Sequence, residues 1–122
     1  MAKYTLTPEQ HEFFKRLKFP NGSARYAAMK ALARGAMIVD IIDPRDIFIR
    51  DGWRCKRCGK PTPESLMGKE QRASPTLDHV VPIVRGGEHA AKNCRCLCQA
   101  CNYLKLDKLD CELEVSSQAT AA

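Results

Sequence analysis

Two pairs of cysteines constrain the fold of this chain more than any other feature of its sequence. Cys55 and Cys58 form the first Cys-x2-Cys pair, and Cys98 and Cys101 form a second pair after 39 intervening residues. Each pair can place two thiolates on one side of a tetrahedral zinc ion, and four cysteines together close a structural site. Four independently buried cysteines would leave the matched spacing unexplained. The pattern therefore predicts a structural zinc site.

The long interval between the pairs has room for a β-hairpin. Residues 77–84 are expected to form a strand, Gly86-Gly87 a turn, and residues 94–97 a returning strand. The second cysteine pair then opens a helix that reaches Leu106. A thioredoxin-like redox role would need one pair at the start of a helix within an α/β pattern, and the sequence shows no such pattern. Cys94 and Cys96 fall outside the pairs and are expected to be small buried hydrophobic residues.

The residues before the first cysteine pair are predicted to be helical. Helices are expected over residues 8–19, 23–34 and 44–50, the first with Thr7 as its N-cap and the second capped by Ser23. The first two helices and the break between them suggest a helix-turn-helix DNA reader. The break is long, however, and the basic residues of the second helix are expected on different sides. We favour a packing or partner-docking role for this segment.

Length and pattern together predict an α+β fold with three parts. The chain has 122 residues, which suits one small domain with an appendage. Such a fold often takes part of its stability from a bound metal. We expect a helical extension over residues 1–44, a zinc-stapled domain over residues 45–110, and a polar, disordered tail over residues 111–122.

The charge distribution favours a polyanionic partner. Lys and Arg number 20 against 14 Asp and Glu, a formal net charge of +6, and residues 106–122 carry one basic and four acidic groups. A basic body fits nucleic acid, although a solvated basic surface is the common alternative. The sequence has neither an apolar run long enough to span a membrane nor a signal-peptide pattern. We therefore expect no membrane partner, a location in the cytoplasm of a bacterial or phage-infected cell, and cysteines that act as ligands rather than disulfides.

The neighbours Asp78 and His79 stand out inside the apolar strand. Ionisable groups in such a segment are costly unless something uses them. Asn93 follows after 13 intervening residues, Asn102 after a further eight, and Lys105 three positions later. A lone Asp-His pair on a strand is more often a satisfied polar pair than a catalytic one.

The run LDHVVPIVRGGEHAAKNCRCLCQACNYLK, residues 77–105, resembles the motif of the HNH endonucleases. The likeness extends over roughly residues 45–106 and includes the lead-in RDGWRC before the first cysteine pair. Asn102 stands where the family often has His, so the chain resembles the HNN subset, which includes the HNH domain of the RNA-guided CRISPR nucleases. The resemblance implies a ββα-metal fold, in which a hairpin and the helix after it hold one divalent ion, and a DNA-cutting activity that leaves a 5′-phosphate and a 3′-hydroxyl.

The chemistry of phosphodiester hydrolysis assigns roles to these residues. A neutral imidazole suits the deprotonation of a water near pH 7, so His79 is the expected general base. Asp78 and Asn102 offer oxygen ligands to Mg²⁺ or Mn²⁺. By resemblance, Asn93 holds the hairpin turn and so orients the base. Two further residues, Arg85 and Lys105, are expected to contact DNA phosphates.

Other classes of function remain open on the sequence. A non-catalytic zinc-ribbon nucleic-acid-binding module would use the same cysteines and basic surface. It has no need for four further residues together: Asp78, His79, Asn93 and Asn102. An accessory subunit of a phage DNA-processing complex and a degenerate, non-cutting relative are further alternatives. The sequence also leaves open a homodimer or a larger assembly. His89 is expected in an exposed loop and His11 on an exposed helix face.

Overall fold

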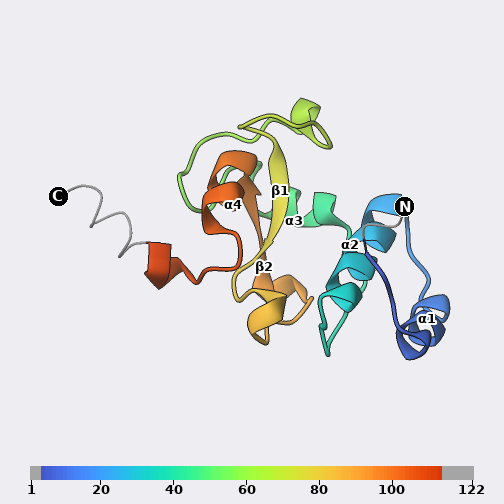
Figure 1. Ribbon diagram of the computed structural model, residues 1–122. Helices are drawn as coiled ribbons and strands as arrows, with labels where there is room; N and C mark the ends of the chain where they lie inside the picture. Colours follow the sequence, from blue (N-terminus) through green and yellow to red (C-terminus); the bar gives the residue numbers. More distant parts are fainter. Residues whose placement is uncertain (1–3, 114–122) are drawn as a thin grey trace.

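A two-stranded antiparallel sheet with helices on both faces organises the chain (Figure 1). The structure, a computed structural model, describes residues 4–113. The sheet and the helix that follows it form the mixed α+β fold that the sequence predicts. The helices and strands, in chain order, are α1 (Pro8–Lys15), α2 (Gly22–Ala33), α3 (Pro44–Arg50), β1 (Pro75–His79), β2 (Cys94–Cys98) and α4 (Gln99–Lys105).

Side-chain caps set the starts of the three N-terminal helices. Thr7 Oγ1 accepts a hydrogen bond from the backbone N–H of Gln10, and Gln10 Oε1 accepts one from the N–H of Thr7, so the predicted capping box forms. The first helix ends at Lys15, earlier than the predicted residue 19. The second begins one residue early, because Asn21 and not Ser23 supplies the capping oxygen.

The hairpin is shorter on its first strand than the sequence predicts. The prediction of a strand over residues 77–84 was wrong at both ends: β1 begins at Pro75 and ends at His79, and the chain then turns into a short 3₁₀ helix, Ile83–Arg85. Pro82 has no backbone N–H to continue a ladder, which favours this turn. The returning strand, Cys94–Cys98, agrees with the prediction to within one residue.

Neighbouring residues of β1 lie on opposite faces of the sheet. Asp78 is opposite Arg95 of β2 on the face that packs against α4, while His79 is opposite Cys94 on the face that packs against α3. On the α3 side of the sheet, Ile42, Ile47 and Cys94 form an apolar cluster. Leu77 packs against this cluster. The α3 side is therefore the apolar core, and the α4 side carries the polar residues of the strand.

The N-terminal helices pack on each other and join the hairpin loop. Phe14 of α1 packs with Ala28 and Leu32 of α2. Residues after α2 then pair with the loop that follows β1, through a parallel bridge between Val39 and His89. The division of the chain at residues 44 and 45 stays a prediction. Within residues 4–113, no helix combines the length and apolar character needed to cross a membrane.

Candidate functional site

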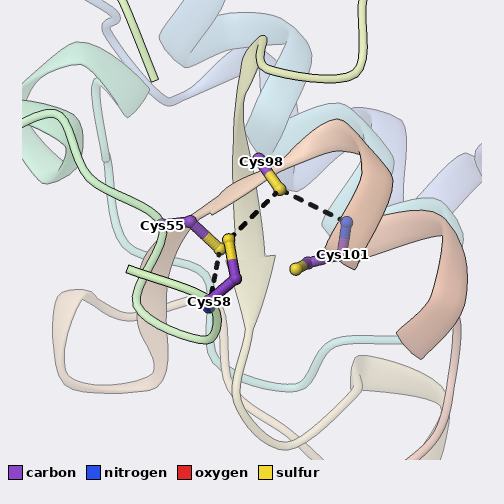
Figure 2. A group of neighbouring side chains, drawn as sticks. All are labelled: Cys55, Cys58, Cys98 and Cys101. Atoms are coloured by element: carbon purple, nitrogen blue, oxygen red, sulfur yellow. Dashed lines mark hydrogen bonds between the residues drawn. The ribbon is translucent and has the colours of Figure 1, made fainter. Parts of the chain in front are cut away.

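The four paired cysteines converge at one end of the sheet (Figure 2). Cys55 and Cys58 lie in the loop after α3, while Cys98 ends β2 and Cys101 lies in α4. Their sulfur atoms all lie within 4.8 Å of one another, and the Sγ atoms of Cys58 and Cys98 are 3.9 Å apart. A tetrahedron with Zn–S bonds of about 2.3 Å has S–S edges of about 3.8 Å. The cluster therefore fits a zinc ion, as predicted.

The backbone around the cysteines favours thiolates. The N–H of Cys58 donates to Cys55 Sγ and the N–H of Cys101 donates to Cys98 Sγ, both at 3.4 Å. Burial opposes ionisation of Cys55, but backbone donors outweigh burial and lower its pKa to about 7. Burial, with the neighbouring thiols, raises the pKa of Cys101 to about 12. Four crowded thiols cannot all ionise without a cation, and zinc removes that conflict.

A second candidate site is a cleft of about 390 Å³ at the open edge of β1. Asp78 and His79 line it from the strand, and Asn102 lines it from α4. Lys30 of α2 and Arg34, the C-cap residue of α2, line the same cleft. Three sequence-distant segments thus bring a carboxylate, an imidazole, an amide and two cations together.

Asp78 is buried and is paired with two cations. Its side chain is 4% exposed. Oδ2 accepts a hydrogen bond from Arg95 Nε at 2.9 Å, and Oδ1 lies 3.3 Å from Lys105 Nζ. Arg95 also makes a two-pronged contact with Asp110 at 2.7 and 2.9 Å. These two cations compensate the burial of the carboxylate, because a buried carboxylate without them would be costly.

Lys105 is buried, and the DNA contact that the sequence suggested for it stays a prediction. Its side chain is 0% exposed, and its ammonium donates to the carbonyl oxygen of His79 at 3.0 Å. Because the same ammonium lies beside Asp78, Lys105 fixes the two neighbouring residues from α4 rather than reaching into solvent. One helical turn earlier, Asn102 Nδ2 donates to Thr76 Oγ1 at 3.0 Å. No described residue is hydrogen-bonded to the Asn102 amide oxygen, which leaves that oxygen available to a cation.

His79 forms a buried contact with a second histidine. Its Nε2 lies 2.9 Å from Nδ1 of His89. Burial, with the neighbouring His89 and the positive charges of Arg34 and Lys30, lowers the pKa of His79 to about 4. The imidazole is therefore neutral at pH 7, which is the state a proton acceptor needs. If His79 donates from Nε2, its Nδ1 carries the lone pair.

Asn93 fastens the loop between the strands. It lies at the end of a short 3₁₀ turn just before β2. Its Oδ1 accepts from the N–H of Val81 at 2.9 Å, and its Nδ2 donates to the carbonyls of Val81 and Glu88 at 3.0 and 2.8 Å. A Cβ atom on Gly87 would lie 1.8 Å from the Val81 carbonyl oxygen, so only glycine fits there. This geometry suits the loop-holding role that the resemblance implies for Asn93.

Three further residues, His89, Lys30 and Arg34, lie in surroundings that differ from those predicted from the sequence. His89 was expected in an exposed loop, and this was wrong: its side chain is 0% exposed because the chain before α3 pairs over the loop. Lys30 and Arg34 were expected on different sides of their helix, yet both line the cleft. Their spacing of four residues was the available signal, since i and i+4 share a helix face. Arg85 is partly exposed and pairs with Glu112 at 2.6 Å.

Comparison with known families agrees with this geometry. Residues 55–108 match the family described as HNH endonuclease. The match spans both cysteine pairs, the hairpin and α4. Residues 55–108 are thus similar to an HNH endonuclease domain. A search among curated proteins found no match.

Proposed function

We propose that this protein is a metal-dependent endonuclease that hydrolyses DNA phosphodiester bonds in the cleft beside β1. The observation that carries the proposal is the convergence of Asp78, His79 and Asn102, all within the segment that matches the HNH endonuclease family, on one cleft. Asp78 and His79 point to opposite faces of β1. A phosphate at the open edge of this strand would therefore lie between the two side chains. A phosphate in that position has the acid and the amide on one side and the imidazole on the other.

His79 acts as the general base in this proposal. A water attacks the phosphorus while the Nδ1 atom of His79 takes its proton. The bond from phosphorus to the 3′-oxygen breaks, and the departing oxygen takes a proton from solvent. His89 holds the reactive tautomer by accepting a hydrogen bond from His79 Nε2, at the 2.9 Å separation of the two nitrogens. Lys105 fixes the backbone of the same residue through the His79 carbonyl.

Asp78 and Asn102 are the residues that would hold Mg²⁺ or Mn²⁺. Carboxylate and amide oxygens are the donors that these hard cations prefer, and the Asn102 oxygen has no hydrogen bond from a described residue. Asp78 shares its oxygens with Arg95 and Lys105, but a carboxylate offers about four acceptor positions. When bound, such an ion stabilises the charge that develops on the phosphate and the departing oxygen.

The basic residues of α2 supply phosphate contacts. Lys30 and Arg34 lie one helical turn apart on the wall of the cleft. Their positive charge reaches the reacting residue, since both contribute to the lowered pKa of His79. Arg85, in the short 3₁₀ helix after β1, would exchange Glu112 for a phosphate. We propose this basic wall as the DNA contact of the N-terminal segment, and one such centre cuts one strand.

A non-catalytic nucleic-acid-binding module is the second candidate. The pairing of Asp78 with two cations favours it, because the carboxylate is already neutralised without a metal. In that case the zinc site and the basic wall would be retained and His79 would have no chemical role.

Relaxation of supercoiled plasmid tests the two candidates. The purified full chain, its zinc retained, is incubated with plasmid in Mg²⁺ or Mn²⁺ and, separately, in a brief excess of chelator. We expect metal-dependent nicked product that falls by 10²-fold or more in His79→Ala. His11→Ala, on α1 away from the cleft, is the matched control and should cut like the parent. Equal product from parent and His79→Ala, or DNA binding without product, would support the binding module.

A further inference from the structure

A second group of metal-ligating side chains lies beside the proposed base, apart from the four paired cysteines. One ligand atom each from His79, His89 and Cys94 lie within 4.8 Å of one another. His79 and Cys94 are directly opposite each other across the sheet, so their side chains share the α3 face. His89 joins them from the loop that Asn93 holds. Nothing in the proposed reaction uses Cys94.

Burial and an unpaired nitrogen mark this group as a ligand site. His89 is 0% exposed and Cys94 is 2% exposed. His89 Nε2 is the buried side-chain nitrogen or oxygen that lacks a hydrogen-bond partner among the described residues. Buried polar atoms in native proteins are nearly always satisfied, and an exception commonly marks an ion or other ligand. A metal bound to these imidazoles would change the hydrogen bonding of both rings.

The donor set selects the kind of ion. Two imidazole nitrogens and one sulfur suit Zn²⁺ and related transition ions, whereas Mg²⁺ requires oxygen ligands. Three protein ligands leave one position of a tetrahedron for water. The site has fewer thiolates than the four-cysteine cluster, so it should bind zinc more weakly and release it more readily.

We propose that His79, His89 and Cys94 form an inhibitory site for Zn²⁺ or a similar transition ion. A zinc ion on His79 Nε2 breaks the hydrogen bond to His89 and leaves the ring proton on Nδ1. The imidazole then has no lone pair for a water. Binding of zinc here is independent of the proposed nuclease activity, while the inhibition rests on that activity.

Metal binding is tested on the full chain in a Cys111→Ser background, which removes an exposed thiol outside both clusters. The four-cysteine site is first filled with one equivalent of Zn²⁺, and Co²⁺ is then titrated. We expect one further equivalent, with a thiolate-to-cobalt absorption band. Cys94→Val should lose this equivalent. Cys96→Ala is the matched control, because Cys96 is a buried cysteine of the same strand and face outside the cluster.

A measurement on the parent protein keeps the test independent of how the variants fold. Side-chain NMR of the histidines during addition of a second Zn²⁺ equivalent should shift the ring signals of His79 and His89 and leave His11 unchanged. No second equivalent, a second equivalent that survives Cys94→Val, or a shift confined to His11 would each overturn the proposal.

The effect on DNA cutting is read in the presence of excess Mg²⁺. We expect the second Zn²⁺ equivalent to slow plasmid nicking at least tenfold in the background protein and in Cys96→Ala, and to leave the rate of Cys94→Val unchanged. Inhibition that more Mg²⁺ relieves and that persists in Cys94→Val would place the zinc on Asp78 and Asn102 and overturn the proposal. If the protein cuts no DNA at all, the cobalt and NMR measurements still decide whether the site exists.

Discussion

The two ends of the small sheet are built in opposite ways. At the cysteine end, four side chains of one type arise from two short motifs and meet at sulfur-to-sulfur distances that suit one ion. At the cleft, different side chains come from α2, β1 and α4, and most of them already have protein partners. The first arrangement suits a closed structural site, and the second leaves one strand edge open to a substrate.

The contrast shows how so short a chain can hold a reactive site. The buried Asp78, with Arg95 and Lys105 around it, needs a rigid frame because charges inside a small core are costly. The cysteine cluster fastens the end of β2 and the start of α4, the two elements that carry Arg95 and Lys105. Stability at one end therefore supports polar groups at the other.

Loss of zinc should have the largest effect. Structural zinc sites contribute about 10–16 kcal/mol of apparent binding free energy, which is comparable with the about 5–15 kcal/mol stability of a whole small domain. Cys98→Ser should therefore lose bound zinc and its cooperative thermal unfolding, as measured by metal analysis and circular dichroism. Cys111→Ser, at an exposed position outside the cluster, is the control. An unchanged unfolding curve in Cys98→Ser would contradict the framing role of zinc.

Asp78→Asn should cause the second-largest loss of stability. This change leaves Arg95 and Lys105 inside the protein without the carboxylate, and breaking a buried ion pair costs about 3–5 kcal/mol. Urea unfolding measures the loss. Asp110→Asn removes the other partner of Arg95 at a more exposed position and should cost less. Equal losses in the two variants would mean that Arg95, rather than the buried network around Asp78, sets the stability of this face.

Asn93→Ala should loosen the loop without unfolding the domain. The side chain makes three hydrogen bonds at about 1 kcal/mol each, so a loss of about 2–3 kcal/mol is expected. The amide proton of Val81 should exchange much faster with solvent. Asn93→Asp keeps the acceptor for that amide and should protect it more. Identical exchange in both variants would argue against the Asn93 contact as the element that holds the loop.

Many features of this fold follow from the local sequence. The other features depend on how segments far apart in the sequence pack against one another. The cysteine spacing, the capping box at Thr7 and the return strand are properties of a few neighbouring residues, so they could be predicted. Burial of His89 could not, because it arises when residues near Val39 pair over the loop. The early end of β1 depends on Pro82 and on the Asn93 side chain, which outweigh the apolar pattern that suggested a longer strand.

The position of Lys30 and Arg34 in the cleft could also not be predicted from the local sequence. Lys30 and Arg34 were recognisable as basic residues one turn apart, but only the position of α2 against the hairpin makes them a wall of the cleft. Asp78, His79 and Asn102 were selected by spacing and resemblance, and the structure brings them to that cleft. Their chemical roles stay predictions, as does DNA contact by Arg85.

The smallest effect is expected for the basic wall. Replacing both Lys30 and Arg34 by Ala removes up to two phosphate contacts, which should reduce the slope of log K against log salt by about 2. Fluorescence anisotropy with a DNA duplex at several salt concentrations measures the slope. The paired control Lys15→Ala with Arg16→Ala removes the same charge from the C-terminal end of α1. An equal change of the salt slope in both double variants would mean that net charge, and not the position of Lys30 and Arg34, sets the DNA affinity.

The separate roles proposed for Asn102 and His79 are tested most directly by the Mg²⁺ dependence of plasmid nicking. The measurement compares the parent with Asn102→Ala and His79→Gln under single-turnover conditions. We predict that Asn102→Ala raises the half-saturating Mg²⁺ concentration at least tenfold, because it removes a proposed metal ligand. His79→Gln should lower the maximal rate and leave that concentration unchanged. An equal shift of the half-saturating Mg²⁺ concentration in both variants, or an unchanged Mg²⁺ dependence in Asn102→Ala, would rule out separate roles for Asn102 and His79.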